Sequence, residues 1–154
     1  ISAVNGIAVG AGFSLALAGD IIICAEEARF SQIFINIGFV PDFGSAYFLP
    51  RLIGMARAKD LVLTGRMVGA KEAKEIGLVS QVVPLSELES TAMNLAKTLA
   101  SRSAKALAFD KMMLNRSLDS DLNTMLEIEA FAQGICFQSD EHKQALQELL
   151  NKKK

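Results

Sequence analysis

Three glycines lie between two apolar runs near the start of the chain, and this pattern constrains the local fold more than any other stretch. The segment reads Val4-Asn5-Gly6-Ile7-Ala8-Val9-Gly10-Ala11-Gly12-Phe13-Ser14-Leu15-Ala16. Glycines gather where the backbone takes a positive φ or approaches another group closely. The apolar run after Gly12 predicts a buried helix over about residues 11–18, and the first N–H groups of a helix are free to face an anion. That anion is either a phosphate or a developing oxyanion.

The phosphate alternative lacks the residues that it needs. A dinucleotide-binding turn has a third glycine, and this chain has Leu15 at that position. Such a turn also needs an acidic residue at the end of its second strand, and this chain has none at the required distance. A P-loop needs a lysine beside its last glycine, and no lysine is near. An oxyanion hole and a simple packing turn therefore remain as alternatives. Ser14 has an equally plain interpretation, since a serine on a helix often bonds back to the preceding turn.

Composition narrows the classes of function. The chain has 154 residues, of which 51% are hydrophobic and 21% charged, so it is long and apolar enough to bury one core. Its net charge of −1 gives no basic face for nucleic acid. A single histidine excludes a histidine metal cluster, and we expect no metal site. Ser14 and Asp20 interrupt the apolar run over residues 6–25, so we expect no membrane insertion.

The two cysteines, Cys24 and Cys136, are too few for a disulfide framework. Two thiols in apolar surroundings fit a reducing compartment. We therefore expect an intracellular protein, in the bacterial cytoplasm or, in a eukaryote, in the mitochondrion or peroxisome.

The order of patterns predicts an α/β protein that passes into an all-helical region. The expected strands are 1–4, 20–25 and 78–83, and residues 30–37 are expected to be a strand followed by a loop. The expected helices are 11–18, 45–52, 56–63, 70–76, 86–100, 103–115, 120–137 and 145–150, and Ser139-Asp140-Glu141, with its N-cap and acidic first-turn character, is expected to open the last of them. A capping box at Ser86 is expected to begin the helix over 86–100. We divide the chain into a first domain, 1–84, and a helical C-terminal region, 85–154, which ends in the Lys152–Lys154 tail.

Asp42 is the candidate for chemistry outside the glycine turn. It lies in the turn-rich segment Ile37–Ser45, and Pro-Asp-x-Gly is ordinary turn chemistry. The neighbouring Phe39, Val40 and Phe43 are expected to exclude water from its carboxylate. A desolvated carboxylate accepts and returns a proton more readily near neutral pH. The residues alone leave a turn role and a catalytic role open.

Further segments complete a pattern with the glycine-rich stretch. They are Asp20-Ile21-Ile22-Ile23-Cys24-Ala25, Ala28-Arg29-Phe30-Ser31, Ile37-Gly38-Phe39-Val40-Pro41-Asp42-Phe43-Gly44, Leu49-Pro50-Arg51-Leu52-Ile53-Gly54, the run from Ala56 to Gly65 and the run from Ala73 to Val83. Together, in this order and over nearly the whole chain, they resemble the crotonase superfamily, the enoyl-CoA hydratases and isomerases. The resemblance implies the C-terminal portion of a crotonase-like ββα spiral, followed by a helical trimerisation region. The N-terminal part of the family is missing from this chain, which begins at Ile1 inside an apolar strand-like run and so has the look of a fragment.

The resemblance also implies a site and its partners. The substrates are acyl-CoA thioesters, with no cofactor beyond the coenzyme A of the substrate, and the assembly is a homotrimer or hexamer. Two backbone N–H groups hold the thioester oxygen, and one of them matches Ala11, between Gly10 and Gly12. The other belongs to the family's N-terminal part. Phe39 and Phe43 are implied substrate contacts. The last helix is implied to reach the coenzyme A of a neighbouring subunit, with Lys143 as a contact for its phosphate.

Departures from the family pattern bear on the reaction. Family hydratases use two glutamates, and the matching positions here hold Ser14 and Phe34. Family members that shift double bonds carry an acid at the position of Asp42, and one acid suffices to move a proton from C2 to C4. The resemblance therefore favours an enoyl-CoA isomerase. The alternatives are a hydratase-type lyase with an acid from elsewhere, and a non-catalytic or truncated paralogue that binds acyl-CoA.

Overall fold

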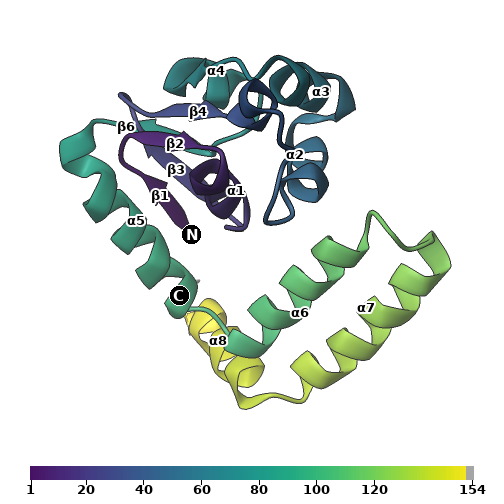
Figure 1. Cartoon of the computed structure of the whole chain (residues 1–154). Coiled ribbons are helices and arrows are strands. Elements are labelled where there is room, and N and C mark those ends of the chain that lie inside the picture. Colours follow the sequence, from purple (N-terminus) through teal and green to yellow (C-terminus); the bar gives the residue numbers. More distant parts are fainter. Residues whose placement is uncertain (152–154) are drawn as a thin grey trace. The chain divides into compact units, whose positions relative to one another are not determined.

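The computed structural model describes residues 1–151 and divides into two compact units, one comprising Ile1–Ala96 and the other beginning at Lys97. Figure 1 shows strands and helices in the first unit and helices alone in the second. Helix α5, Leu85–Ala100, lies mostly in the first unit, because Leu88 packs against Ile23 and Ala25. The structure thus divides the chain twelve residues later than the expected boundary after residue 84 (96 − 84 = 12). The expected Lys152–Lys154 tail lies outside the described residues.

Two small sheets form the centre of the first unit. The first sheet has the order β1-β3-β6 and is parallel, with β1 Ser2–Val4, β3 Ile22–Ala25 and β6 Gln81–Val83. The second has the order β2-β4-β5, with β2 Ile7–Val9, β4 Arg29–Ser31 and β5 Val68–Gly69, and only β5 runs antiparallel. Consecutive strands β1 and β2 therefore belong to different sheets.

Short helices surround these strands (Figure 1). They are α1 Ala11–Leu17, the 3-10 helix η1 Ile33–Ile37, α2 Ser45–Ile53, α3 Met55–Thr64 and α4 Ala70–Glu75. Helix α1 is buried through Phe13 and Leu17, and the Phe13 ring lies 5.4 Å from the Phe30 ring of β4. The core that results holds α1 against the second sheet, so the glycine turn has a rigid support.

The structure confirms the buried helix after the glycines and corrects three details around it. Strand β2, which feeds the turn, was not expected, and neither was β5. The strand expected over 78–83 is shorter, because Leu78 and Val79 are buried in the turn that precedes it. Ser86 is not a helix cap, since α5 already begins at Leu85.

The second unit consists of three helices, as the sequence predicts. They are α6 Ala104–Arg116, α7 Leu122–Phe137 and α8 Asp140–Asn151. Helix α8 begins where Ser139-Asp140-Glu141 was expected to open it, and Ser139 Oγ accepts from the His142 N–H at 3.2 Å. Ser103 and Asp121 cap α6 and α7 by accepting hydrogen bonds from the N–H groups of Ala106 and Thr124.

Few apolar side chains of these three helices are buried. Ala132 is the buried apolar residue within them, whereas large apolar side chains stand in solvent, namely Met112, Leu114, Leu122, Leu126, Phe131, Phe137, Leu146, Leu149 and Leu150. Exposed apolar patches of this kind mark surfaces that contact a partner. Over the part of the chain that is described, no helix combines the length and the hydropathy needed to cross a bilayer.

Candidate functional site

The turn from β2 into α1 is held at both ends of Gly10. Gly10 has φ 53° and ψ −125°, a backbone conformation that favours glycine. Its N–H donates to the Ser31 carbonyl at 2.9 Å. Its carbonyl accepts two hydrogen bonds from Ser14, one from the backbone N–H at 2.9 Å and one from Oγ at 3.1 Å. The back-bonding interpretation of Ser14 is therefore correct, and this side chain is fully buried.

The first N–H groups of α1 face outward from this turn. Intrahelical bonding begins with the Ser14 N–H, so the N–H groups of Ala11, Gly12 and Phe13 precede the first intrahelical bond. Ala11 and Gly12 are exposed, whereas Phe13 is buried. No atom lies within 4 Å of the place where a Cβ on Gly12 would stand. The Ala11 N–H therefore belongs to an exposed residue and has no acceptor within the helix.

Phe34 of η1 closes the other side of the turn. Its ring lies 3.6 Å from the position that a Cβ on Gly10 would occupy. Ser14 and Phe34, which match the two glutamate positions of family hydratases, therefore both adjoin Gly10. One is a neutral hydroxyl already bonded to the backbone, and the other is a hydrocarbon ring. Neither side chain can accept and return a proton near neutral pH.

Asp42 occupies the loop between η1 and α2. Its carbonyl accepts from the Ser45 N–H at 2.9 Å, which closes the turn that the sequence predicts. Its Oδ1 is buried and has no hydrogen-bond partner. The next residue, Phe43, has φ 44°, which is rare for a bulky side chain. A buried unpaired oxygen and a strained neighbour both destabilise a fold, and such features cluster at functional sites.

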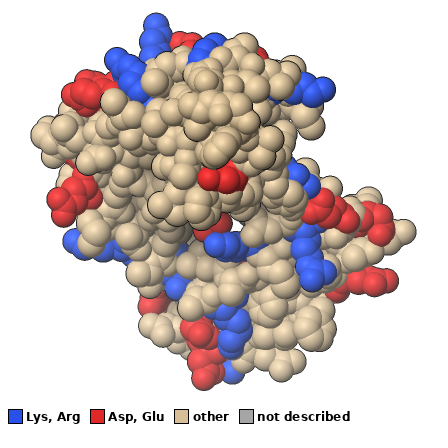
Figure 2. Space-filling view, in the orientation of Figure 1, with Lys and Arg blue, Asp and Glu red and all other residues tan. Residues whose placement is uncertain are grey.

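The residues on either side of Asp42 are themselves largely exposed, although Asp42 Oδ1 is buried. The side chains of Phe39, Val40 and Phe43 are 65%, 79% and 71% exposed. The loop turns them outward after the Phe39 N–H bonds to the Phe34 carbonyl. Figure 2 shows that uncharged residues cover most of the face in view.

The structure brings the Asp42 loop and the glycine turn into one unit. Helix α2, which follows Asp42, packs against α1, and η1, which precedes the loop, contacts Gly10 through Phe34. The loop therefore joins two elements that both touch the turn. Lys143, in contrast, lies on α8 of the second unit, where its Nζ pairs with Asp140 at 3.2 Å.

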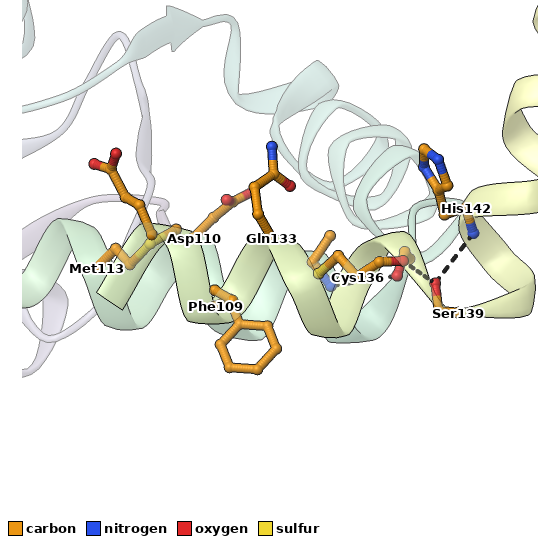
Figure 3. Close-up of a pocket in the computed structure, with 11 residues that line it drawn as sticks. Phe109, Asp110, Met113, Gln133, Cys136, Ser139 and His142 are labelled. Carbon is orange, nitrogen blue, oxygen red and sulfur yellow. Dashed lines mark hydrogen bonds between the residues drawn. The ribbon is translucent and has the colours of Figure 1, made fainter. Parts of the chain in front are cut away.

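A cavity of about 410 Å³ lies within the second unit, between α6, α7 and the beginning of α8. Figure 3 shows Asp110, Gln133, Cys136 and His142 among the side chains around it. Ser139 closes one end, because its Oγ donates to the Cys136 carbonyl at 2.7 Å and accepts from the His142 N–H at 3.2 Å. The residues that the sequence singles out as substrate contacts do not line this cavity.

Other reactive side chains of the described residues do not form a second site. No group of three or more His, Cys, Asp or Glu side chains within residues 1–151 is placed to hold a metal ion. Burial raises the pKa of the Cys24 thiol to about 11, which suppresses the reactive thiolate at neutral pH. Asp42 and the glycine turn therefore remain the principal candidates for chemistry.

Comparison with known proteins identifies the family. The model of the enoyl-CoA hydratase/isomerase family matches residues 1–154. A short-chain-enoyl-CoA hydratase of Clostridium acetobutylicum is 40% identical over 154 residues, which is 100% of this chain and 59% of that protein. The 1,2-epoxyphenylacetyl-CoA isomerase of Escherichia coli K12 is 39% identical over 153 residues, 99% of this chain and 58% of that protein.

Solved structures agree with this assignment. An enoyl-CoA hydratase/isomerase from Cupriavidus metallidurans CH34 superposes with a TM-score of 0.93 at 43% identity, over 97% of this chain and 57% of that chain. A protein from Thermobifida fusca YX, solved with acetoacetyl-CoA, superposes with a TM-score of 0.83 at 37% identity, over 85% of this chain and 51% of that chain. The chain belongs to the enoyl-CoA hydratase/isomerase family and has the crotonase fold. It spans 59% and 58% of the length of the Clostridium acetobutylicum and Escherichia coli relatives.

Proposed function

We propose that the native protein is an enoyl-CoA isomerase that moves a double bond by proton transfer through Asp42. The observation that carries the proposal is the set of side chains at the site. Ser14 and Phe34 leave the glycine turn without a carboxylate, whereas Asp42 has a buried oxygen that no protein group bonds. A double-bond shift needs one acid–base group, and this arrangement supplies one.

In the proposed reaction, the thioester oxygen of a 3-enoyl-CoA accepts a hydrogen bond from the Ala11 N–H, with Gly10 and Gly12 leaving room for it. The Asp42 carboxylate removes a proton from C2, and the electron pair moves through C1 onto the oxygen to form a dienolate. The protonated Asp42 then returns the proton to C4, and the double bond moves to C2–C3. Each donor of such an oxyanion hole contributes a factor of about 10²–10³ to kcat.

The substrate class of the proposal is an acyl-CoA thioester. The family and the acetoacetyl-CoA complex of a relative support this choice. The exposed Phe39 and Phe43 provide an apolar surface beside Asp42 for the acyl chain. Lys143 is the proposed contact for a coenzyme A phosphate. The exposed apolar side chains of both units support assembly into a homotrimer or hexamer.

A hydratase-type lyase is the second candidate, because the Clostridium acetobutylicum relative is a short-chain-enoyl-CoA hydratase. It would require an acid outside this chain, since Ser14 and Phe34 cannot activate water. The Escherichia coli relative, in contrast, is an isomerase, and an isomerisation adds no water to its substrate.

The test is the Asp42→Asn variant of the native protein at its full length. We expect a fall of about 10²–10⁴-fold in the conversion of 3-hexenoyl-CoA to its conjugated 2-enoyl isomer, with assembly unchanged by gel filtration. Glu89→Gln, at an exposed carboxylate of α5, is the control and should retain full activity. Retained isomerisation in Asp42→Asn would refute the proposal. Hydration of crotonyl-CoA faster than isomerisation would favour the lyase.

A further inference from the structure

We propose that the Ser14 hydroxyl is a positioning residue for the oxyanion donor at Ala11, an inference that rests on the proposed function. Ser14 does not point its hydroxyl toward solvent above the turn. It is fully buried, and its Oγ donates to the Gly10 carbonyl at 3.1 Å. The neutral hydroxyl thus acts on the peptide bond that carries the Ala11 N–H.

The geometry of that peptide unit links the two groups. The Gly10 carbonyl and the Ala11 N–H belong to one planar trans peptide, and in such a plane the C=O and N–H bonds point in opposite directions. Fixing the direction of the Gly10 carbonyl therefore fixes the direction of the Ala11 N–H. Two donors from Ser14, its backbone N–H and its Oγ, hold this carbonyl from within the helix.

Gly10 needs this restraint more than an ordinary helix cap. A glycine reaches many φ and ψ values, so its flanking peptide planes rotate more freely than those of other residues. On the other side of Gly10, the N–H is held by the Ser31 carbonyl at 2.9 Å. With both sides held, the Ala11 N–H keeps one direction before a ligand arrives, as a preorganised oxyanion donor must.

The second hydrogen bond also changes the strength of the donor. A peptide carbonyl that accepts a hydrogen bond becomes more polarised, and its own N–H then donates more strongly, by about 10–30% per bond. Glutamate, the family hydratase residue at this position, has a carboxylate that accepts and cannot donate to a carbonyl. The serine thus replaces an acceptor by a donor at the same place in the helix.

A positioning role and a purely structural role of Ser14 predict different effects of the Ser14→Ala substitution. The bond from a helix serine to the carbonyl four residues back does not stabilise a helix and slightly weakens it. Ser14→Ala should therefore leave the fold intact, and its effect should appear in the bound thioester. We expect kcat to fall by roughly 3- to 10-fold with KM unchanged, a fraction of the about 10²–10³-fold that a whole donor contributes.

The decisive measurement is difference infrared spectroscopy of butyryl-CoA with a ¹³C thioester carbonyl, bound to the native protein. This probe has no double bond to shift, so it reports polarisation of the carbonyl without turnover. We expect the carbonyl stretch of the bound thioester to move to lower frequency in the native protein, and to move less in Ser14→Ala. Ser14→Thr should show the same shift as the native protein, because its hydroxyl reaches the same carbonyl.

Thr64→Ala is the matched control. It removes another helix hydroxyl that donates to the carbonyl four residues back, that of Asp60 at 2.6 Å, in α3 and not at the peptide of Ala11. We expect this variant to keep the native carbonyl shift. Equal shifts in Ser14→Ala and the native protein would overturn the positioning role alone. No shift in the native protein would overturn the proposed oxyanion hole, and the positioning role with it.

Discussion

Replacement of Gly10 by alanine should destabilise the first unit by about 1–3 kcal/mol. Two effects could contribute to this loss of stability, steric overlap of the new Cβ and strain in the backbone. The first source, steric overlap, is small, because the new Cβ would meet Phe34 at 3.6 Å and Ile33 at 3.8 Å, ordinary contact distances. The second source is the backbone. A residue with a Cβ is strained at φ 53°, ψ −125°, and such conformations cost about 1–3 kcal/mol each.

Gly12→Ala provides the internal comparison two residues further along the chain. Gly12 lies inside α1 with no atom within 4 Å of its would-be Cβ, and its φ lies outside the positive range. Alanine is favoured over glycine in a helix by about 0.5–1 kcal/mol, so Gly12→Ala should stabilise. The two variants therefore differ by about 1.5–4 kcal/mol in opposite directions.

Urea unfolding of the native protein and the two variants, followed by circular dichroism, tests this difference. A change in stability moves the midpoint at constant slope. A Gly10→Ala midpoint equal to or above that of Gly12→Ala would refute the argument that the backbone conformation of Gly10 requires glycine.

Two further predictions concern titratable groups. Iodoacetamide labelling at pH 8 followed by peptide mapping should modify the partly exposed Cys136 well before Cys24, because burial raises the pKa of Cys24 to about 11. Equal labelling rates would contradict this. The pKa of Asp121 lies below its ordinary 3.8, chiefly because Thr124 donates its hydroxyl to the carboxylate. A lowered pKa stabilises the fold above the ordinary value, so the stability difference between native protein and Asp121→Ala should shrink as pH falls below 3.8. A difference independent of pH would contradict it.

Local patterns predicted the helices well and the turn only in part. The apolar run after Gly12 predicted α1, because a buried helix has a period that a sequence displays. Strand β2 is three residues long between two glycines, too short to show a period. It forms because it pairs with β4, which lies some twenty residues further along the chain. The sequence of β2 itself carries no signal of a partner at that distance.

The site shows the same division between local and distant causes. The bond from Ser14 to Gly10 spans four residues and follows from the helix alone. The position of Phe34 against Gly10 depends on how η1 packs, and only the family resemblance pointed to it. The exposure of Phe39 and Phe43 could not be predicted from the sequence, because apolar composition does not say whether a covering surface exists.

The pairing of β6 with β3 has a consequence for synthesis of the chain. All four residues of β3 are buried, and one of its edges is completed only by β6, where Ser80 bonds to the Ile22 carbonyl 58 residues away. At a translation rate of about 5–20 residues per second, those residues take roughly 3–12 s to appear. During that interval an apolar strand has an unpaired edge, the type of surface on which nascent chains aggregate and chaperones act.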